Sequence, residues 1–315
     1  MKASAADRRI RSLRGPKPFV DPWKAHGSVI EPERRPGGAI EQTLTVFLAG
    51  AECSFTCSFC DLWRFTIDTP TPPGALPRQL TTVLQSMPNA PRDRLKLYNA
   101  SNFFDRRAVP REDEPAIAAV AAGFTALTVE SHANTIGPQV AEFARRIPCR
   151  FEVAVGLETI HPEASAHLNK RMELWRFDAA AAFLANHGID LRVFVLLGTP
   201  YVPADVAVEW AVRSVEYAAR RGAALVSVIP VRGGNGELES LARTGHFTPP
   251  TLAQLETTLD RCVGFAPAVV TADLWDVDRL PACPECRTAR VERLRHLNLR
   301  GAPAAPVSCS ACDAR

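Results

Sequence analysis

Three cysteines lie close together in the sequence, at Cys53, Cys57 and Cys60, in the pattern C-x3-C-x2-C. They follow an apolar run, Thr43–Leu48, that has the pattern of a strand. Three thiolates at this spacing can hold three corners of a 4Fe–4S cube, and no fourth cysteine is near. Because ferredoxin-type runs supply all four thiolates, a triad leaves the fourth iron free for an outside ligand. The pattern therefore predicts a cluster whose open iron binds and activates a ligand from outside the chain.

Other interpretations of this triad are a zinc site or unrelated thiols. Zinc sites usually combine paired C-x2-C knuckles, and the spacing C-x3-C-x2-C fits that arrangement poorly. Two further cysteines, Cys149 and Cys262, have no partner at a ligand spacing. We expect both to be small buried hydrophobic residues.

Two cysteine pairs near the end of the chain, Cys283-x2-Cys286 and Cys309-x2-Cys312, are separated by 22 residues. Two such pairs make a four-thiolate tetrahedral site, which is typical of structural zinc. The gap slightly exceeds the usual window of about 15–20 residues. A second iron–sulfur cluster is the rival, because four thiolates also suit 4Fe–4S. Zinc is favoured, because a pair of knuckles gives tetrahedral sulfur geometry easily.

The composition is that of an ordinary soluble globular protein, with 315 residues, 46% of them hydrophobic and 23% charged. The longest apolar runs, such as Val193–Leu197, are far too short to span a bilayer. The amino-terminal residues lack the apolar core of a secretory signal. Nine cysteines in such a chain favour metal binding in a reducing compartment over disulfides. We therefore expect a cytoplasmic protein with no membrane partner.

Positive charge is concentrated in two stretches. Residues 1–36 carry nine lysines and arginines against four acidic residues, and Arg287–Arg300 carries five arginines against one glutamate. A polyanion such as RNA would be attracted to these ends. A solvated arm and a solvated helix face are the alternatives.

From residue 41, short apolar runs alternate with stretches of helical periodicity, the pattern of a parallel α/β domain. The predicted strands are Thr43–Leu48, Leu95–Tyr98, Ala126–Glu130, Phe151–Leu157, Leu191–Leu197 and Leu225–Ile229. The predicted helices are Leu80–Met87, Glu114–Ala122, Pro138–Arg146, Asp178–His187, Ala204–Arg220 and Arg287–Leu299. We expect Asp178 to cap the start of its helix and Gly188 to end it.

Six strands alternating with helices fit either an open doubly wound sheet or a partial (β/α)6, TIM-like barrel. No G-x-G-x-x-G follows any predicted strand, which weakens the dinucleotide-binding alternative. The chain divides into a basic, Pro-rich extended arm at residues 1–40, a barrel with its extension at 41–282, and a small four-cysteine metal module at 283–315. In either fold, ligands bind at the carboxyl ends of the strands.

Polar side chains gather at those predicted strand ends. They are Asn99, Ser101, Asn102, Glu130, His132, Glu158, Lys170 and Arg171. Glu130 and His132 could bind a substrate or act as catalytic acid and base, although a satisfied surface histidine explains His132 equally well. Lys170 or Arg171 could pair with a ligand carboxylate, and a solvated helix cap is the alternative for that segment.

The cysteine spacing, placed directly after a first strand, resembles the radical S-adenosylmethionine (SAM) superfamily. The resemblance favours the partial barrel. It implies a 4Fe–4S cluster whose open iron chelates the amino and carboxylate groups of SAM. One electron, from a donor such as flavodoxin or ferredoxin, then cleaves SAM to methionine and a 5′-deoxyadenosyl radical, which abstracts hydrogen from a substrate.

The resemblance also implies roles for individual residues. Phe59, just before the third cysteine, would pack on adenine, and Val195 and Leu197 would form an apolar platform near it. The segment with Asn99, Ser101 and Asn102 would meet the SAM amino group. Glu158 would hold the ribose or the methionine part of SAM, Lys170 or Arg171 its carboxylate, and Glu130 or His132 the ribose or the substrate.

Within the superfamily, the chain resembles the branch that contains the Elongator catalytic subunit and the methylthiotransferases, and most of all the radical SAM proteins of archaeosine formation. That likeness implies a modified base in tRNA as substrate and a partner transferase. A radical SAM enzyme acting on a small-molecule metabolite is one alternative. A non-enzymatic iron–sulfur or RNA-binding accessory protein is the other.

Overall fold

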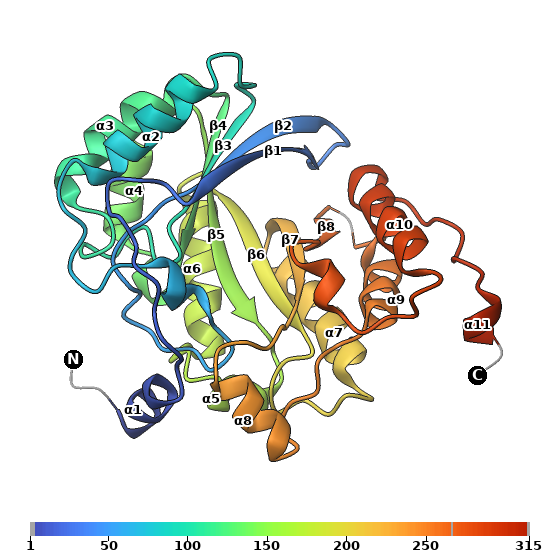
Figure 1. The fold of residues 1–315 in the computed structure, drawn as a ribbon. Helices are drawn as coiled ribbons and strands as arrows, with labels where there is room; N and C mark the ends of the chain where they lie inside the picture. The colour runs from blue at the N-terminus through green and yellow to red at the C-terminus, as the bar shows by residue number, and fades with distance from the viewer. Residues whose placement is uncertain (1–3, 266, 314–315) are drawn as a thin grey trace.

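The computed structural model describes residues 4–265 and 267–313. It contains one curved eight-stranded sheet with helices packed along its convex side (Figure 1). The strands lie in sequence order from β1 to β8, and all neighbours are parallel except β1 and β2, which form an antiparallel hairpin. The strands are β1 Gly27–Arg34, β2 Ile40–Phe47, β3 Arg94–Tyr98, β4 Ala126–Ser131, β5 Arg150–Glu158, β6 Asp190–Leu197, β7 Ala223–Pro230 and β8 Val269–Ala272.

Helices follow most of the parallel strands and run back to the start of the next one, which is the connection that parallel pairing requires. They are α1 Ala5–Ser12, α2 Ala75–Ser86, α3 Glu114–Ala121, α4 Pro138–Ala144, α5 Pro162–His167, α6 Leu174–Asn186, α7 Ala207–Arg220, α8 Glu237–Arg243, α9 Leu252–Cys262, α10 Arg287–Arg300 and α11 Ser310–Asp313. No helix among the described residues is long and apolar enough to cross a membrane.

The predicted α/β partial barrel is confirmed, and the six predicted strands correspond to β2 through β7. The extended arm predicted at residues 1–40 is wrong in two places, because the described part contains α1 and the edge strand β1. The pattern of β1 is obscured by Pro32 and by charged residues, which are tolerated at a sheet edge. The four-residue strand β8 is too short for a pattern to show.

The start of α6 also differs from the prediction. The helix begins at Leu174, so Asp178 lies inside it and is not a cap. The Asp178 carboxylate instead accepts a hydrogen bond from the Tyr217 hydroxyl (2.5 Å) of α7. Gly188 does end the helix, as predicted, because its backbone has φ of 65°, a conformation that glycine adopts without strain.

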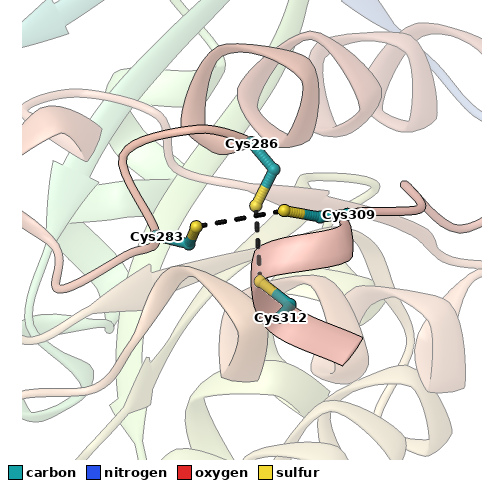
Figure 2. A group of neighbouring side chains, drawn as sticks. All are labelled: Cys283, Cys286, Cys309 and Cys312. Carbon is teal, nitrogen blue, oxygen red and sulfur yellow. Dashed lines mark hydrogen bonds between the residues drawn. The ribbon is translucent and has the colours of Figure 1, made fainter. Parts of the chain in front are cut away.

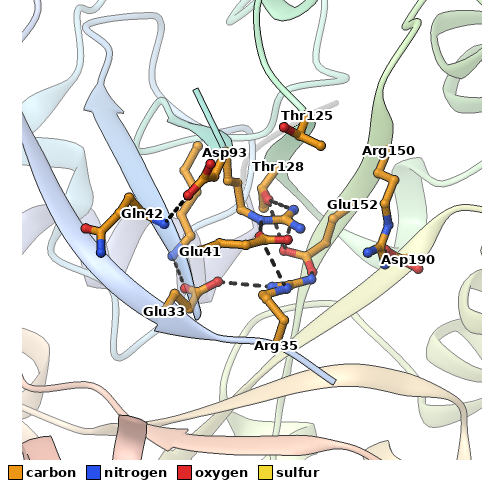
Figure 3. Close-up of polar contacts among 12 residues, drawn as sticks. Glu33, Arg35, Glu41, Gln42, Asp93, Thr125, Thr128, Arg150, Glu152 and Asp190 are labelled. Carbon is orange, nitrogen blue, oxygen red and sulfur yellow. Dashed lines mark hydrogen bonds and ion pairs between the residues drawn. The ribbon is translucent and has the colours of Figure 1, made fainter. Parts of the chain in front are cut away.

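The two faces of the sheet have opposite chemistry, because side chains alternate along each strand. One face carries apolar residues such as Leu95, Val129 and Val153, which pack against the helices and form the main core. The other face carries a buried network of charged side chains near the amino ends of the strands (Figure 3). Its members are Glu33, Arg35, Glu41, Arg94, Lys96, Thr128, Glu152 and Arg192.

Glu152 of β5 is the centre of this network and is fully buried. Its carboxylate accepts hydrogen bonds from Arg192 Nε (2.9 Å) and Thr128 Oγ1 (3.0 Å), and it pairs with Arg35 from the β1–β2 turn. Burial alone would raise the pKa of Glu152, but the guanidinium groups of Arg192, Arg35 and Arg94 outweigh burial and hold this pKa well below its usual range. The network therefore fixes the β1–β2 hairpin to the parallel strands.

Replacing Glu152 by glutamine is expected to destabilise the fold by about 3–5 kcal/mol, because it leaves buried guanidinium groups without their carboxylate. Glu209→Gln is the matched control, since Glu209 pairs with Arg213 and Arg261 on the surface and its loss should have no measurable effect. Urea unfolding of the two variants measures the difference. Equal stabilities would show that the buried network does not hold the hairpin.

Candidate active site

The three cysteines lie on a long loop between β2 and α2, over the carboxyl ends of the strands. Apart from one turn of 3₁₀ helix at Leu62–Phe65, the loop has no helix or strand. Side chains from this loop line a small cavity together with Arg14 and Ala100. The lining residues from the loop are Glu52, Cys53, Phe55, Thr56, Cys57, Cys60 and Trp63. The structure thus brings the three predicted cluster ligands to one cavity.

All three cysteines are half-buried, and the surrounding protein desolvates their thiols. Burial raises the pKa of Cys53, raises that of Cys57 to about 12, and raises that of Cys60 well above its usual value. The Lys170 ammonium opposes this effect at Cys53 and Cys57 without overcoming it. Thiolates at these positions need a cation beside them, which bound iron would supply. Three cysteines and no fourth thiol line the cavity, so the donor set fits a cluster held by three thiolates.

Contacts from distant parts of the chain hold the loop in shape. Asn169, which precedes Lys170, donates from Nδ2 to the Thr56 carbonyl oxygen (2.8 Å) and to Asp7 Oδ1 (3.0 Å). Thr56 also donates to Asp7, the residue that completes the capping box of α1. From the other side, Asn235 Nδ2 donates to the Ser58 carbonyl oxygen (2.8 Å). The cluster loop is therefore clamped between α1, the turn before α6 and the start of α8.

Arg171, one of the two residues predicted to pair with the SAM carboxylate, takes part in this clamp. Its guanidinium pairs with the buried Asp7 carboxylate. Burial opposes ionisation of Asp7, but hydrogen bonds from Thr56, Asn169 and Arg171 hold its pKa well below its usual range. The sequence could not reveal this pair, because 164 positions separate its members.

Lys170 and Glu158 form a buried ion pair beside the cysteines, with Lys170 Nζ 2.7 Å from Glu158 Oε1. Burial disfavours the ammonium, but the Glu158 carboxylate keeps the pKa of Lys170 above its usual value. Gly156 makes room for the pair: a Cβ there would overlap the Glu158 carboxylate and lie 2.8 Å from Lys170 Nζ. Glu158 is the last residue of β5, and Lys170 reaches it from the segment between α5 and α6.

Glu130, at the end of β4, organises the segment that follows β3. Its Oε1 accepts a hydrogen bond from the Asn99 backbone N–H (2.6 Å). Burial raises the pKa of Glu130 to about 7, against the opposing hydrogen bonds from the backbone of Asn99, Ser101 and Ala100. Glu130 therefore fixes the backbone of this segment, and its carboxylate is turned toward the Asn99–Ser101 segment.

Asn99 and Ser101 carry polar atoms that nothing in the described chain satisfies. The Asn99 side chain is 0% exposed, yet neither its Oδ1 nor its Nδ2 has a hydrogen-bond partner, and the Ser101 hydroxyl also lacks one. Buried polar groups are nearly always hydrogen-bonded. Orphaned atoms in a segment whose neighbour Ala100 lines the cysteine cavity therefore point to a polar ligand at this place.

Asn102 and His132, both predicted as site residues, have hydrogen-bond partners within the chain. Asn102 Oδ1 accepts from the Ser131 hydroxyl (3.0 Å) and the Phe104 N–H (3.0 Å). His132 stacks on Phe55 at 3.8 Å, and both ring nitrogens contact backbone groups. Burial lowers the pKa of His132 to about 3. A neutral histidine with both nitrogens engaged supports the cysteine loop and is poorly placed for acid–base chemistry.

The apolar residues at the end of β6 are divided between the two faces of the sheet. Val195 and Leu197 are fully buried in the core between the sheet and its helices. Leu196 lies on the other face of β6 and forms a small cluster against which Phe59 packs. A continuous apolar strand does not show in sequence which side chains face which way, so the sequence missed Leu196. The packing of Phe59 on adenine stays a prediction.

Comparison with known proteins gives a distant relative and clear fold matches, while no family model matches the chain. Archaeosine synthase subunit beta of Methanosarcina acetivorans is 24% identical over 226 residues, which cover 68% of this chain and 65% of the relative. A radical SAM methyltransferase from Sphaerobacter thermophilus has a TM-score of 0.53 at 16% identity, covering 82% of this chain and 79% of that one. Elp3 of Methanocaldococcus infernus has a TM-score of 0.51 at 11% identity, covering 70% and 59%.

The solved structures show that the chain has the half-barrel fold of radical SAM proteins. The half-barrel fold that the resemblance predicts is thereby confirmed. In sequence, the chain is similar to archaeosine synthase subunit beta, and it spans 65% of the length of that relative.

Glu130 is expected to make stability depend on pH. In the unfolded chain its carboxyl loses its proton near pH 4.3, but in the folded protein only near pH 7. The stabilisation is therefore complete below about pH 4.3 and is lost as the pH rises through 7. Between pH 5 and 7 the melting temperature of the native protein should fall relative to that of Glu130→Gln, measured by differential scanning fluorimetry. Parallel curves for the two proteins would contradict this assignment.

Proposed function

We propose that this protein is a radical SAM enzyme whose cluster is held by Cys53, Cys57 and Cys60. The observation that carries the proposal is the pairing of three desolvated thiols with the orphaned polar atoms of Asn99 in the adjacent segment. The three thiols are suited to bind iron, and the unpaired side-chain amide of Asn99 is suited to bind a polar ligand next to that iron. The chemistry that such a cluster supplies when bound is one-electron cleavage of SAM to methionine and a 5′-deoxyadenosyl radical, which abstracts hydrogen from the substrate.

The chain's own residues then have distinct tasks. Asn99 and Ser101 would hydrogen-bond the polar methionine end of SAM, and the backbone that presents them is fixed by Glu130. The Lys170 ammonium, held by Glu158, would attract a carboxylate near the thiolates. Phe59 and the apolar cluster with Leu196 would cover the adenine ring. Fixing these groups in place orients the cofactor and excludes water.

The amino-terminal segment closes the site from outside. Arg14 lines the cysteine cavity, stacks over the Trp63 ring at 4.9 Å and pairs with Glu52 (2.8 Å). Lys17 pairs with Asp68 (2.7 Å) farther along the same loop. The segment would thereby cover part of the cysteine cavity, where a radical reaction requires that water be excluded.

The substrate that we propose is a modified base in tRNA. The enzyme would act together with a partner transferase and would receive electrons from a donor such as flavodoxin or ferredoxin. The proposal is supported by the likeness to archaeosine synthase subunit beta. The basic amino-terminal stretch adds only modest support, because Arg14, Lys17 and Arg35 are paired with acidic residues within the chain. Helix α10 contributes less than its charge suggests, because Arg290 and Arg293 are paired with Glu256 inside the chain. A small-molecule substrate is the second candidate, and salt-sensitive tRNA binding separates the two.

The proposal is tested by purifying the protein without oxygen, reconstituting it and adding SAM with dithionite. We expect about four irons bound by the triad and release of 5′-deoxyadenosine, measured by liquid chromatography. Cys57→Ala should lose iron and reduce 5′-deoxyadenosine to background, because one corner of the cluster has no ligand. Cys149→Ala is the control, since Cys149 lies far from the cavity at the start of β5 and should change neither quantity. Full activity in Cys57→Ala, or a wild-type protein without iron, would overturn the proposal.

A further inference from the structure

Four cysteines from two distant segments converge beside helix α10 (Figure 2). Cys283 and Cys286 precede the helix, with Cys286 at its amino-terminal cap, while Cys309 and Cys312 come from the segment after it. The Cys283 and Cys309 sulfurs are 4.0 Å apart, the Cys286 and Cys312 sulfurs 3.7 Å apart, and all four lie within 4.8 Å of one another. The arrangement is a compact four-sulfur site remote from the cysteine triad.

The sulfur spacing discriminates among the groups that four cysteines could hold. A tetrahedral zinc ion with Zn–S bonds of about 2.3 Å places its ligands about 3.8 Å apart. A 4Fe–4S cube holds its thiolates roughly 6 Å apart, because each binds a different iron. Disulfides would bring two sulfurs to about 2.05 Å. The two pairs at 3.7 and 4.0 Å, and the upper limit of 4.8 Å for all pairs, are closer to a single tetrahedral ion than to a cube.

Arg290 supplies the positive charge that such a site needs around it. Its Nε lies 3.0 Å from Cys286 Sγ and another guanidinium nitrogen 3.9 Å from Cys312 Sγ, while it also pairs with Glu256 of α9. Four thiolates on a divalent ion carry a net charge of −2, which a guanidinium partly offsets. Hydrogen bonds to metal-bound thiolates of this kind orient the ligands and tune the site.

Helix α10, which this site anchors, lies against both edge strands of the half-barrel. On one side, the Asn298 side chain exchanges two hydrogen bonds with the backbone of Ala272, the last residue of β8 (2.8 and 2.9 Å). On the other, the Arg34 side chain of β1 lies so close to Gly301, at the end of the helix, that a Cβ there would overlap the guanidinium. Leu294 and Leu297 are fully buried in the main core. The helix is therefore a seam between the first and last strands, where an open sheet would leave unpaired edges.

The segment after α10 folds back along the helix to reach the metal ligands. Arg293 donates hydrogen bonds to the carbonyl oxygens of Ala304 (2.7 Å) and Ala305 (2.9 Å). Residues 301–308 have no helix or strand, so few backbone contacts hold them in place. A metal ion that joins the two ends of this loop would therefore supply much of the free energy that orders it.

We propose that Cys283, Cys286, Cys309 and Cys312 bind one zinc ion, and that this ion secures α10 as the seam of the half-barrel. This role is independent of the cluster chemistry proposed for the cysteine triad. The ion staples the returning segment to the start of α10, and the helix in turn covers the edges of β1 and β8.

The metal assignment is tested by elemental analysis of three variants purified from cells grown in zinc- and iron-supplemented medium. The variant with Cys53, Cys57 and Cys60 all changed to alanine should retain one zinc per chain and no iron. Cys309→Ser should lose zinc and keep iron, and Cys149→Ser should keep both. Iron remaining in the triple variant would identify a second cluster, and a triple variant without zinc would overturn the zinc site; neither result depends on the triad's function.

The seam is tested on the triple-alanine variant, which avoids dependence on whether Cys309→Ser folds. Hydrogen exchange is compared before and after zinc is removed with a strong chelator. Exchange should become faster in α10 and in β1, with the amides of α3 as an internal control that stays unchanged. Faster exchange confined to residues 301–313, with β1 unaffected, would show that the ion orders only its own loop. Unchanged exchange in all segments would also overturn the proposal.

Discussion

The loop that carries Cys53, Cys57 and Cys60 depends for its shape on the buried junction of Asp7, Thr56 and Asn169. A long loop without regular structure cannot hold three desolvated thiols in register by local contacts alone. The junction joins α1, the cysteine loop and the turn before α6, and it places Lys170 next to the thiols. The amino-terminal segment is in this sense part of the site, because it holds one end of the clamp.

The half-barrel supplies the surface on which the cysteine loop is held by these contacts. Parallel strands end at one edge, so the segments after β3, β4 and β5 bring Asn99, Glu130 and Glu158 to the same side of the sheet. At the opposite ends of the strands, the Glu152 network locks the β1–β2 hairpin in place. Helix α10 covers the outer edges. The Glu152 network and helix α10 each hold one part of the sheet in place, and together they support the strand ends that lie under the cysteines.

The sequence predicted the parallel strands, the half-barrel and the convergence of the cysteines, because these follow from local apolar patterns and spacing. It could not predict which polar residues at the strand ends are free. Arg171 forms an ion pair with Asp7, and Asn102 accepts a hydrogen bond from Ser131. Both partners are distant in sequence and are brought near only by the fold. The side chain of Asn99 has no hydrogen-bond partner among the described residues, which also depends on the fold and cannot be read from the sequence. The direction of the β6 side chains was also hidden, since every residue from Val195 to Leu197 is apolar.

The central claim is that the triad holds a cluster with an open iron next to Asn99. Electron paramagnetic resonance of the dithionite-reduced protein, recorded with and without SAM, tests it most directly. The account predicts a cluster signal that shifts when SAM is added, and in Asn99→Ala the same signal with a shift that requires about tenfold more SAM, as expected for one lost buried hydrogen bond. A signal that SAM leaves unchanged in the native protein would contradict it.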